Sequence, residues 1–445
     1  MEYSKTLLRI KDIRYRFLNF LLFIFFCTVL FQNLQYAVGG IRIMGYQIAG
    51  IIFLLFFWSN KFISPRSVLT KKQDVLPLII LYLLMILGAA ISSVGVITMV
   101  GTFTQFLKGF LELLFFNIFL ISLIMYLAEN KYSDAYKFLH FLLIMAGLSC
   151  VYQFFAIYFM LSAGVSLDDL IFPNLVNSDR GDQSEMLIGL NETTGFRHGG
   201  FLVSPNTMAT LTICVVPITY YLANIKTMWL LTLVLIFIIS LLAGLSLSGW
   251  LGMAVTLLTM LLLAERRSLK KFVFSFGLLL SLTTLIVMID WWLDSNIILG
   301  FVDILEYRFM NTNYLESTRY EGTMAGLDLF SKSPIFGSGI NSSTLLLQDY
   351  PIFSLVGGSI HNYWLELFVS VGLFAIPTVA YYLFFLFRSR TLKNIYYKAL
   401  FVSLCGLIVN GFFHSSIAKP GIQAFLVLLY LCAIAHQKHV RNKHF

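Results

Sequence analysis

Charged side chains are scarce in this sequence: only 12% of its 445 residues are Asp, Glu, Lys or Arg. Soluble domains carry about a quarter charged residues, so the composition excludes an ordinary soluble protein. Cysteine is sparse too, and the five cysteines lie in apolar runs without Cys-x-x-Cys or Cys/His spacing. This pattern excludes a disulfide framework and a cysteine metal site. The chain also lacks a Gly-x-x-x-x-Gly-Lys-Ser/Thr motif, so it has no sequence signature of an ATPase.

Hydrophobic residues, in contrast, make up 58% of the chain. Apolar runs of about 20 residues predict membrane-spanning helices. We therefore expect an all-α polytopic membrane protein that forms a single membrane domain over residues 1–445. The start of the chain is basic, but no cleavage site follows the first apolar run, and a retained first span is expected. About twelve spans are predicted, near 17–35, 41–58, 75–94, 104–128, 138–160, 201–222, 227–246, 249–264, 272–292, 362–387, 397–413 and 420–435.

The distribution of Lys and Arg predicts the orientation of these spans. Cytoplasmic loops of membrane proteins are enriched in both residues. If the N-terminus is cytoplasmic, the segments on its side and Lys398 hold about 23 of the 31 Lys and Arg residues, which leaves about eight elsewhere. Both termini are therefore expected in the cytoplasm. The formal net charge of +9 is then a topology signal, and no nucleic-acid partner is expected.

Two long polar segments, 161–200 and 293–361, lie on the external side in this topology. Long loops in compact proteins are usually functional, so any chemistry is expected at the outer face. The cytoplasmic loops are too short for a soluble catalytic domain. A transporter or flippase is an alternative from another class, but it should place its charged groups near mid-membrane. A binding or scaffold protein is a third and weaker interpretation.

The stretch "TTGFRHGGFLVSPNTMA", residues 193–209, contains the first candidate site. Ser204-Pro205-Asn206 has the pattern of a helix start, with Ser as the N-cap and Pro at the first helical position. Arg197 precedes it, and an arginine beside a helix N-terminus can bind an anion. The alternative is an arginine at the membrane interface that extends to lipid headgroups.

The second candidate is "STRYEGTMAGLDLFSKSPIFGSG", residues 317–339. Its apolar residues follow a helical spacing, which predicts an amphipathic helix on the membrane surface, ended by Pro334 and the following glycines. Arg319 stands near the start of this helix, where it is unfavourable for the helix dipole, and Glu321 follows it. Two interpretations of Arg319 are therefore open: a functional residue, or a solvated charge in a loop.

The third candidate is "GSIHNYWLELFVSVG", residues 358–372. Asn362 and Glu366 are four residues apart and share a helix face, and His361 lies at the mouth of the helix. Ionisable groups inside a membrane usually face a cavity or a partner and mark a function. The alternative for Glu366 is a structural carboxylate bonded to another helix.

Three further pairs of polar residues are given structural interpretations. Lys108 and Glu112 are expected to neutralise each other within one span. The pair at 168–169 is expected to be solvated loop carboxylates. His414 and Lys419 are expected to be anchors at the membrane interface.

The order of these motifs resembles the O-antigen ligase/polymerase family of bacterial membrane proteins. The resemblance covers roughly residues 190–380 and rests on Arg197 with "GGFLVSPNTMA", "LAGLSLSGWLGM", Arg319 in its loop, and "HNYWLELFVSVGLF". Relatives often carry a Ser-Arg pair at the hairpin where this chain has Ser246-Leu247-Ser248-Gly249. A third arginine is therefore missing there.

The resemblance implies a metal-independent glycosyltransferase of the GT-C type, without a cofactor, at the outer face of the cytoplasmic membrane. The implied substrates are glycans on undecaprenyl diphosphate, and a chain-length regulator and a flippase are the implied protein partners. The preferred activity is an inverting polysaccharide polymerase, and an O-antigen ligase or a protein O-oligosaccharyltransferase is the alternative. The implied catalytic residues are His361, Arg319 and Arg197, and the supporting substrate-binding residues are Asn206, Glu321, Asn362 and Glu366. Arginine suits the first role, because its bidentate contacts neutralise a leaving diphosphate.

Overall fold

The structure of the protein is a computed structural model. It describes residues 2–30, 35–38, 41–59, 73–98, 103–129, 132–163, 167, 170, 200–202, 204–223, 229–244, 246–263, 312–350, 360–389 and 393–442. Arg197, Asp168 and Asp169 lie outside these residues.

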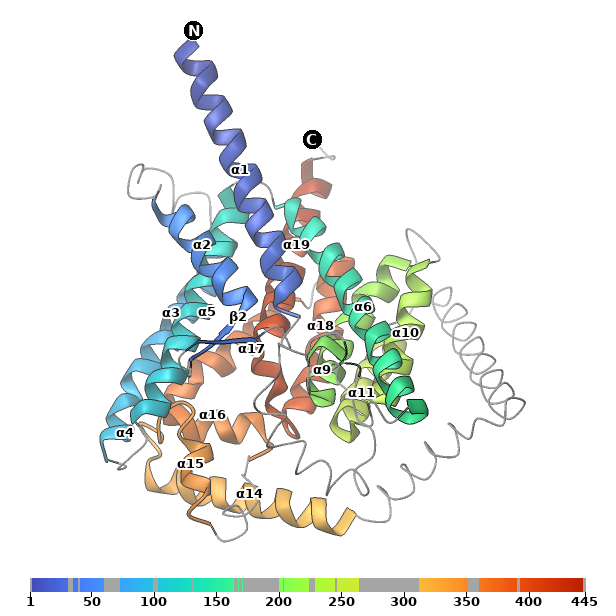
Figure 1. Ribbon diagram of the computed structural model, residues 1–445. Coiled ribbons are helices and arrows are strands. Elements are labelled where there is room, and N and C mark those ends of the chain that lie inside the picture. The colour runs from blue at the N-terminus through green and yellow to red at the C-terminus, as the bar shows by residue number, and fades with distance from the viewer. Residues whose placement is uncertain are drawn as a thin grey trace, which may run out of the picture.

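The described chain is predominantly helical, as its composition predicts (Figure 1). The helices are α1 (Glu2–Thr28), α2 (Gly45–Ser59), α3 (Leu76–Ile91), α4 (Ser93–Thr98), α5 (Phe103–Glu129), α6 (Asp134–Ala163), α9 (Pro205–Ala223), α10 (Trp229–Ala243), α11 (Leu247–Leu262), α14 (Thr312–Lys332), α15 (Ser343–Leu347), α16 (Tyr363–Val371), α17 (Ile376–Arg388), α18 (Ile395–Gly411) and α19 (Pro420–Asn442). Short 3-10 turns are η1 (Gly200–Leu202), η2 (Gly372–Ala375) and η3 (Ser415–Ala418).

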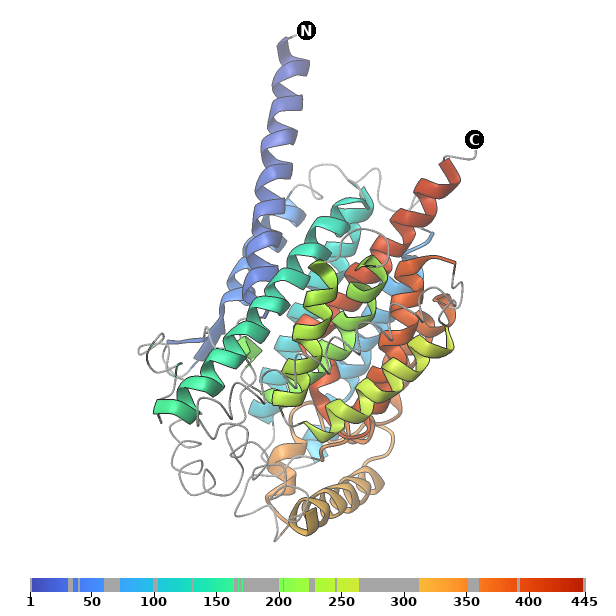
Figure 2. The same ribbon diagram turned by 90° about the vertical axis from the view of Figure 1, so that its right-hand side faces the viewer.

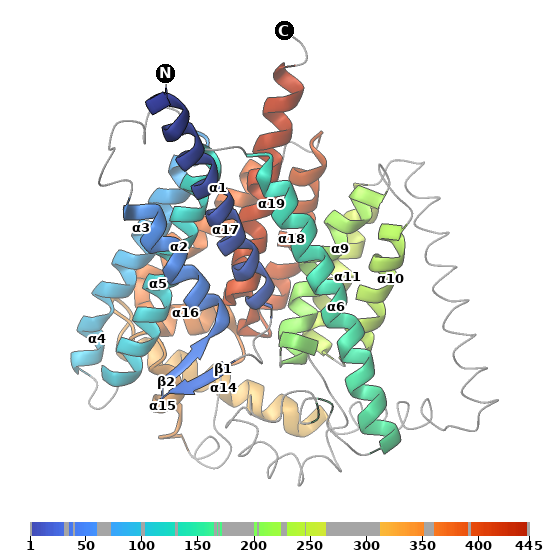
Figure 3. The same ribbon diagram turned by 45° about the horizontal axis from the view of Figure 1, so that its top comes forward.

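One short antiparallel hairpin, which the apolar runs do not predict, interrupts this helical pattern. Strand β1 (Gln35–Val38) pairs with β2 (Ile41–Met44). Figure 3 shows the hairpin beyond the adjoining ends of α1 and α2. Residues 41–44 were expected to begin the second span, which instead starts as α2 at Gly45.

Several helices are long and apolar enough to cross a membrane, and the protein is an integral membrane protein. Within the described residues five helical segments meet this criterion: Leu76–Ile97, Phe103–Glu129, Asp134–Phe159, Tyr363–Arg388 and Pro420–Val440. Three shorter apolar helices accompany them, at Gly45–Ser59, Leu247–Leu262 and Ile395–Gly411. The expectation of twelve spans extends over residues outside the described ranges and stays a prediction.

The helix starts follow from local sequence. Helix α9 begins at Pro205, as the Ser-Pro-Asn pattern predicts. Asn394 caps α18: its Oδ1 accepts a hydrogen bond from the Tyr396 amide at 3.0 Å, and its Nδ2 donates to the Ala433 carbonyl at 2.8 Å. A capping side chain satisfies an amide that the first helical turn leaves without a partner. The same residue also fixes α18 against α19.

The two chain ends lie at the same end of the helical bundle, and α14 crosses the opposite end (Figures 1 and 2). Polar contacts join the helices at the end with the termini. Asp74, just before α3, is 3.2 Å from Lys438 of α19 and 3.7 Å from Arg388 of α17. The Lys438 ammonium also lies 4.4 Å from the ring centroid of Tyr132. These basic residues come from segments that the sequence assigns to one side of the membrane.

The span Tyr363–Arg388 is not one continuous α-helix. It consists of α16 and α17, joined by η2 at Gly372, whose φ is +59°. A Cβ atom at Gly372 would lie 2.3 Å from the Ile335 carbonyl oxygen, so the junction requires glycine. The loop after α14 closes on this junction, because the Ser338 and Gly339 amides donate to the carbonyls of Val369 and Ser370 at 2.7 and 2.9 Å.

Helix α14 is fixed to the bundle by a small apolar cluster. Ala325 and Leu329 of α14 are buried with Leu347, Ile360 and Val369. Ile360 immediately precedes His361, so the cluster connects α14 to the start of α16. Also on α14, Asp328 forms an exposed 2.7 Å ion pair with Lys332, which lowers the pKa of the Asp328 carboxyl group. An exposed pair of this kind contributes little stability, so the apolar cluster is the main attachment.

Candidate functional site

His361 occupies a strained backbone position at the end of the bundle that α14 crosses. Its φ is +54°, in the left-handed region that is uncommon for a residue other than glycine. Asn362 follows as the N-cap of α16: its Oδ1 accepts from the Leu365 amide at 3.1 Å. The backbone on both sides of His361 is thus fixed, by the apolar cluster at Ile360 and by the cap at Asn362. Strain of this kind is typical of functional sites.

A second histidine, His414, lies beside His361. The centroids of the two imidazole rings are 6.3 Å apart, and their planes are tilted by 41°. The Nδ1 atom of His414 accepts a hydrogen bond from the Ser416 amide at 3.1 Å, and the Ser416 hydroxyl oxygen is 2.6 Å from the same nitrogen. An Nδ1 that accepts an amide hydrogen carries no proton, so in the neutral ring the proton is on Nε2. The sequence interpretation of His414 as an interface anchor missed this pairing.

The N-terminal end of α9 reaches the same group through Ser416. The hydroxyl groups of Thr207 and Ser416 are 3.1 Å apart, and both side chains are buried. The neighbouring Asn206 accepts a hydrogen bond from the Ser246 hydroxyl at 2.8 Å. Ser246 in turn caps α11, because its oxygen accepts from the Gly249 amide at 3.2 Å. Asn206 therefore joins the starts of two helices next to the paired histidines.

The remaining candidates are placed less completely. Arg319 lies in α14, about 9 Å along the helix before Ala325 at 1.5 Å per residue. The structure describes the backbone of Arg319 but not its side chain. Glu321 is exposed on the same helix. Arg197 is not among the described residues, so the described part of the site brings together His361, Asn362, Glu366, His414 and the helix start at Asn206.

Glu366 lies one turn into α16, where its amide donates to the Asn362 carbonyl at 2.9 Å. Its Oε2 atom is shielded from solvent and has no hydrogen-bond partner among the described residues. Ser415 and Lys419 are the polar groups that interact with its carboxyl group. A shielded carboxylate oxygen without a partner is unfavourable, so the contacts with Ser415 and Lys419 leave one oxygen of Glu366 unsatisfied among the described residues.

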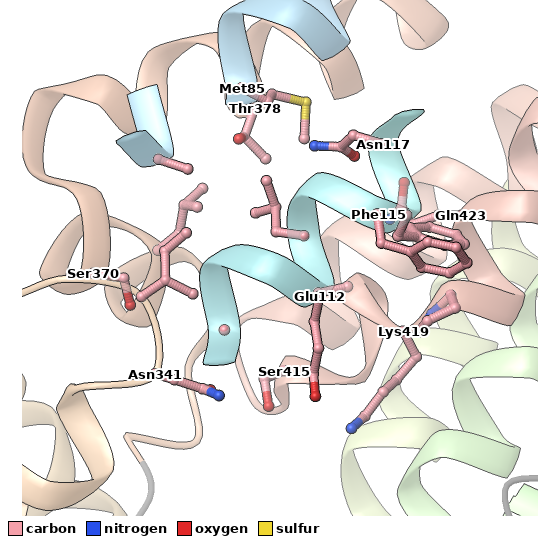
Figure 4. A pocket seen from close by; sticks show the side chains of 18 of the residues that line it. Met85, Glu112, Phe115, Asn117, Asn341, Ser370, Thr378, Ser415, Lys419 and Gln423 are labelled. Carbon is pink, nitrogen blue, oxygen red and sulfur yellow. The ribbon is translucent and has the colours of Figure 1, made fainter. Parts of the chain in front are cut away.

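Glu366 lines a cavity of about 400 Å³ between α2, α3, α5, α16, α17 and the start of α19. Glu112 and Asn117 of α5 also line it, with Asn341, Ser415 and Lys419. Figure 4 shows the side chains of Glu112, Ser415 and Lys419 directed toward one open side of this space.

The expected ion pair between Lys108 and Glu112 is wrong in the structure. Lys108 and Glu112 form no ion pair within the described part of the chain, and Glu112 faces the cavity instead. Lys419 lines the same cavity. A spacing of four residues is compatible with an ion pair. It does not reveal that polar residues of α16 and α19 line the same cavity as Glu112. Of the residues that line this cavity, Glu366 is the one to which the sequence analysis assigns a possible function.

The segment 231–380 matches the family model described as O-antigen ligase. This match supports the O-antigen ligase/polymerase family that the sequence motifs resemble. No curated protein matches the chain. The match supports a function of the ligase/polymerase type, and the matching family acts on lipid-linked oligosaccharides in the membrane.

The O-antigen ligase segment contains Arg319, Glu321, His361, Asn362 and Glu366. Arg197 and Asn206 precede it, and His414 and Lys419 follow it. The family match thus covers the start of α16 but not the residues of α9 and η3 that lie beside it. No cluster of three or more His, Cys, Asp or Glu that could hold a metal ion occurs in the described ranges.

Proposed function

We propose that this protein is a polysaccharide polymerase of the O-antigen ligase/polymerase family. It transfers a growing glycan from undecaprenyl diphosphate to the non-reducing end of the next lipid-linked repeat unit. The observation that carries the proposal is His361, held at a positive φ beside His414 at the end of the bundle away from the basic termini. This end is the outer face of the cytoplasmic membrane, since the basic segments are cytoplasmic.

The reaction forms one bond and breaks one. The acceptor hydroxyl oxygen attacks the anomeric carbon of the donor sugar from the face opposite the diphosphate, so the configuration inverts. The bond between the anomeric carbon and the diphosphate oxygen breaks, and the electron pair leaves with undecaprenyl diphosphate. His361 accepts the hydroxyl proton, a role suited to an imidazole that titrates near neutrality. Arg197 and Arg319 stabilise the charge on the leaving diphosphate through bidentate contacts.

The other proposed residues support this arrangement. Asn362 fixes the start of α16 behind His361, and Asn206 fixes the starts of α9 and α11 beside His414. Glu321, on the exposed surface of α14, and Glu366, in the cavity, bind sugar hydroxyls. No metal ion or cofactor takes part in the proposed step. A chain-length regulator and a flippase are the proposed protein partners.

The family match is described as O-antigen ligase, and this favours ligation as the second candidate. A ligase or a protein O-oligosaccharyltransferase uses the same donor and the same chemistry but another acceptor. Purified full-length protein in proteoliposomes should be given undecaprenyl-diphosphate-linked repeat units alone. Products with two or more repeats on one lipid support the polymerase.

Two results would contradict the polymerase in this assay. Transfer only after addition of a lipid A core or an acceptor protein would identify the ligase or the oligosaccharyltransferase instead. Unchanged repeat units that appear on the opposite leaflet of proteoliposomes would identify a flippase. All three outcomes are separable by the mass of the lipid-linked product and its accessibility to an added glycosidase.

A further inference from the structure

The cavity between α5 and α16 contains two buried polar atoms that no described residue satisfies. Asn117 of α5 is only 5% exposed, and its Nδ2 has no hydrogen-bond partner. The Oε2 atom of Glu366 is likewise shielded and without a partner. Both residues line the same cavity. One atom is a donor and the other is an acceptor, and they come from helices far apart in the sequence.

Unsatisfied polar atoms in a membrane-spanning bundle are unfavourable, because neither lipid nor an apolar core replaces water as their partner. A leucine at position 117 would pack into α5 without this penalty. Buried polar groups that persist inside membranes usually face a cavity and mark a substrate site. The pair therefore indicates that a polar molecule completes the hydrogen bonding of this cavity.

The wall of the cavity brings further polar groups close to this pair. Asn341 reaches it in the left-handed conformation, with φ of +63°. Gly109 of α5 permits this approach, since a Cβ atom there would lie 3.0 Å from the Asn341 Cβ. Gln423 of α19 also lines the cavity, and its amide donates to the Tyr382 hydroxyl at 2.7 Å. Donors and acceptors thus line several sides of the space.

The size and the lining of the cavity restrict the class of ligand. Its volume of about 400 Å³ lies near the lower end of the roughly 300–1,000 Å³ of small-molecule sites. Aromatic side chains such as Tyr363 and Phe374 alternate with the polar groups. The described lining carries two carboxyl groups, Glu112 and Glu366, and one ammonium group, Lys419. This excess of carboxyl groups disfavours an acidic ligand and favours hydroxyl or amino groups.

We propose that this cavity binds one uncharged or amino sugar ring of the lipid-linked glycan, with Asn117 and Glu366 as its inner hydrogen-bonding partners. The Asn117 amide donates to a sugar hydroxyl, and the Glu366 carboxyl group accepts from a hydroxyl or an amino group. Glu366 lies roughly 6 Å along α16 from Asn362, so the bound ring is close to His361. The inference rests on the proposed function, because it assigns this ring to the substrate of that enzyme.

Direct binding tests the cavity without requiring turnover. Full-length protein in nanodiscs should be titrated with methyl glucoside, glucosamine and glucuronate, and binding should be followed by saturation-transfer NMR. We expect methyl glucoside and glucosamine to bind and glucuronate to bind about tenfold more weakly or not at all. Equal binding of all three sugars, or no signal above that of empty nanodiscs, would overturn the proposal.

Asn117→Leu is the decisive variant, because it fills the position with an apolar side chain of similar size. It should weaken methyl glucoside binding by about tenfold or more, as expected for loss of a buried hydrogen bond. The matched control is Tyr221→Phe, which removes another buried polar atom without a partner but lies outside the cavity lining. Tyr221→Phe should bind methyl glucoside as the wild type does.

Asn117→Leu with unchanged sugar binding would show that the cavity is an unfilled void or is occupied by lipid. If Asn117→Leu does not fold, Glu366→Gln replaces it as the test variant. Glu366→Gln keeps the shape of the side chain and should weaken glucosamine more than methyl glucoside, since it loses the carboxylate. Equal affinity of Glu366→Gln and wild type for both sugars would overturn the proposal.

A transfer assay separates this proposal from the proposed function. Asn117→Leu should raise the KM for the lipid-linked substrate and change kcat little, because the bound ring does not react. If wild-type protein binds glycosides but forms no transfer product, the proposed function fails and the sugar site stands. If wild-type protein makes polymer and Asn117→Leu leaves both KM and glycoside binding unchanged, the sugar site fails and the proposed function stands.

Discussion

The hydrogen bonding between Ser416 and His414 predicts a graded loss of activity in Ser416→Ala. The Ser416 hydroxyl is 2.6 Å from His414 Nδ1, and it also lies 3.1 Å from the Thr207 hydroxyl. The variant removes both of these interactions but keeps the 3.1 Å hydrogen bond from its own backbone amide to Nδ1. His414 should then keep its tautomer but lose part of its fixed orientation beside His361.

The size of this effect follows from the hydrogen bonds that the substitution removes. A neutral hydrogen bond contributes about 0.5–1.5 kcal/mol, and about 1.4 kcal/mol corresponds to a tenfold change in rate. Only the interaction with His414 bears on the rate, so we expect Ser416→Ala to slow transfer about 2- to 12-fold. The matched control is Ser403→Ala, which removes one buried hydrogen bond, from Ser403 to the Cys214 carbonyl at 2.9 Å. Ser416 and Ser403 are both 0% exposed.

Initial rates of polymer formation should be measured for both variants in nanodiscs, together with their thermal unfolding. Similar losses of stability with a slower rate only in Ser416→Ala support the positioning of His414. Equal rates in the two variants would refute the reasoning, because loss of packing alone would then explain both. A rate in Ser416→Ala equal to that of the wild type would remove His414 from the site.

Other residues give independent tests. Asn362→Ala should destabilise the start of α16 by about 1 kcal/mol through loss of its cap, and an unchanged unfolding temperature would contradict the capping geometry. Arg319→Lys should stay impaired, because an ammonium group cannot replace the bidentate fork; full activity would exclude diphosphate binding by Arg319. In a background without native cysteines, Arg319→Cys should react with an impermeant thiol reagent in intact cells and Lys393→Cys only after permeabilisation, and the reverse pattern would invert the proposed topology.

The sequence predicts those parts of the fold that depend on local pattern. Apolar runs locate α3, α5, α6 and α19, and Ser204-Pro205 locates the start of α9. The β1–β2 hairpin is missed, because its eight residues are mostly apolar, as the neighbouring spans are, and their composition does not set them apart. The break at Gly372 is missed as well, since a glycine in an apolar run does not reveal a positive φ.

The candidate site shows the same limit. His361, Asn362 and Glu366 are close together in the sequence, and their spacing already places them at one helix start. His414 lies more than 50 residues away, and its position beside His361 depends on how η3 packs against α16. Glu112 has a plausible partner four residues away, and only the tertiary structure directs it into the cavity. The sequence therefore does not predict which residues far apart along the chain become neighbours in the structure.

The most direct test of the central claim is the transfer rate of purified His361→Ala. Loss of a general base should reduce the rate about 10²- to 10⁴-fold, while the protein inserts and unfolds as the wild type does. His140→Ala is the control, since the His140 ring hydrogen-bonds only to the Tyr136 carbonyl of its own helix α6, at 2.7 Å, among the described residues. Its rate should be unchanged. Polymer formed by His361→Ala at the wild-type rate would contradict the account.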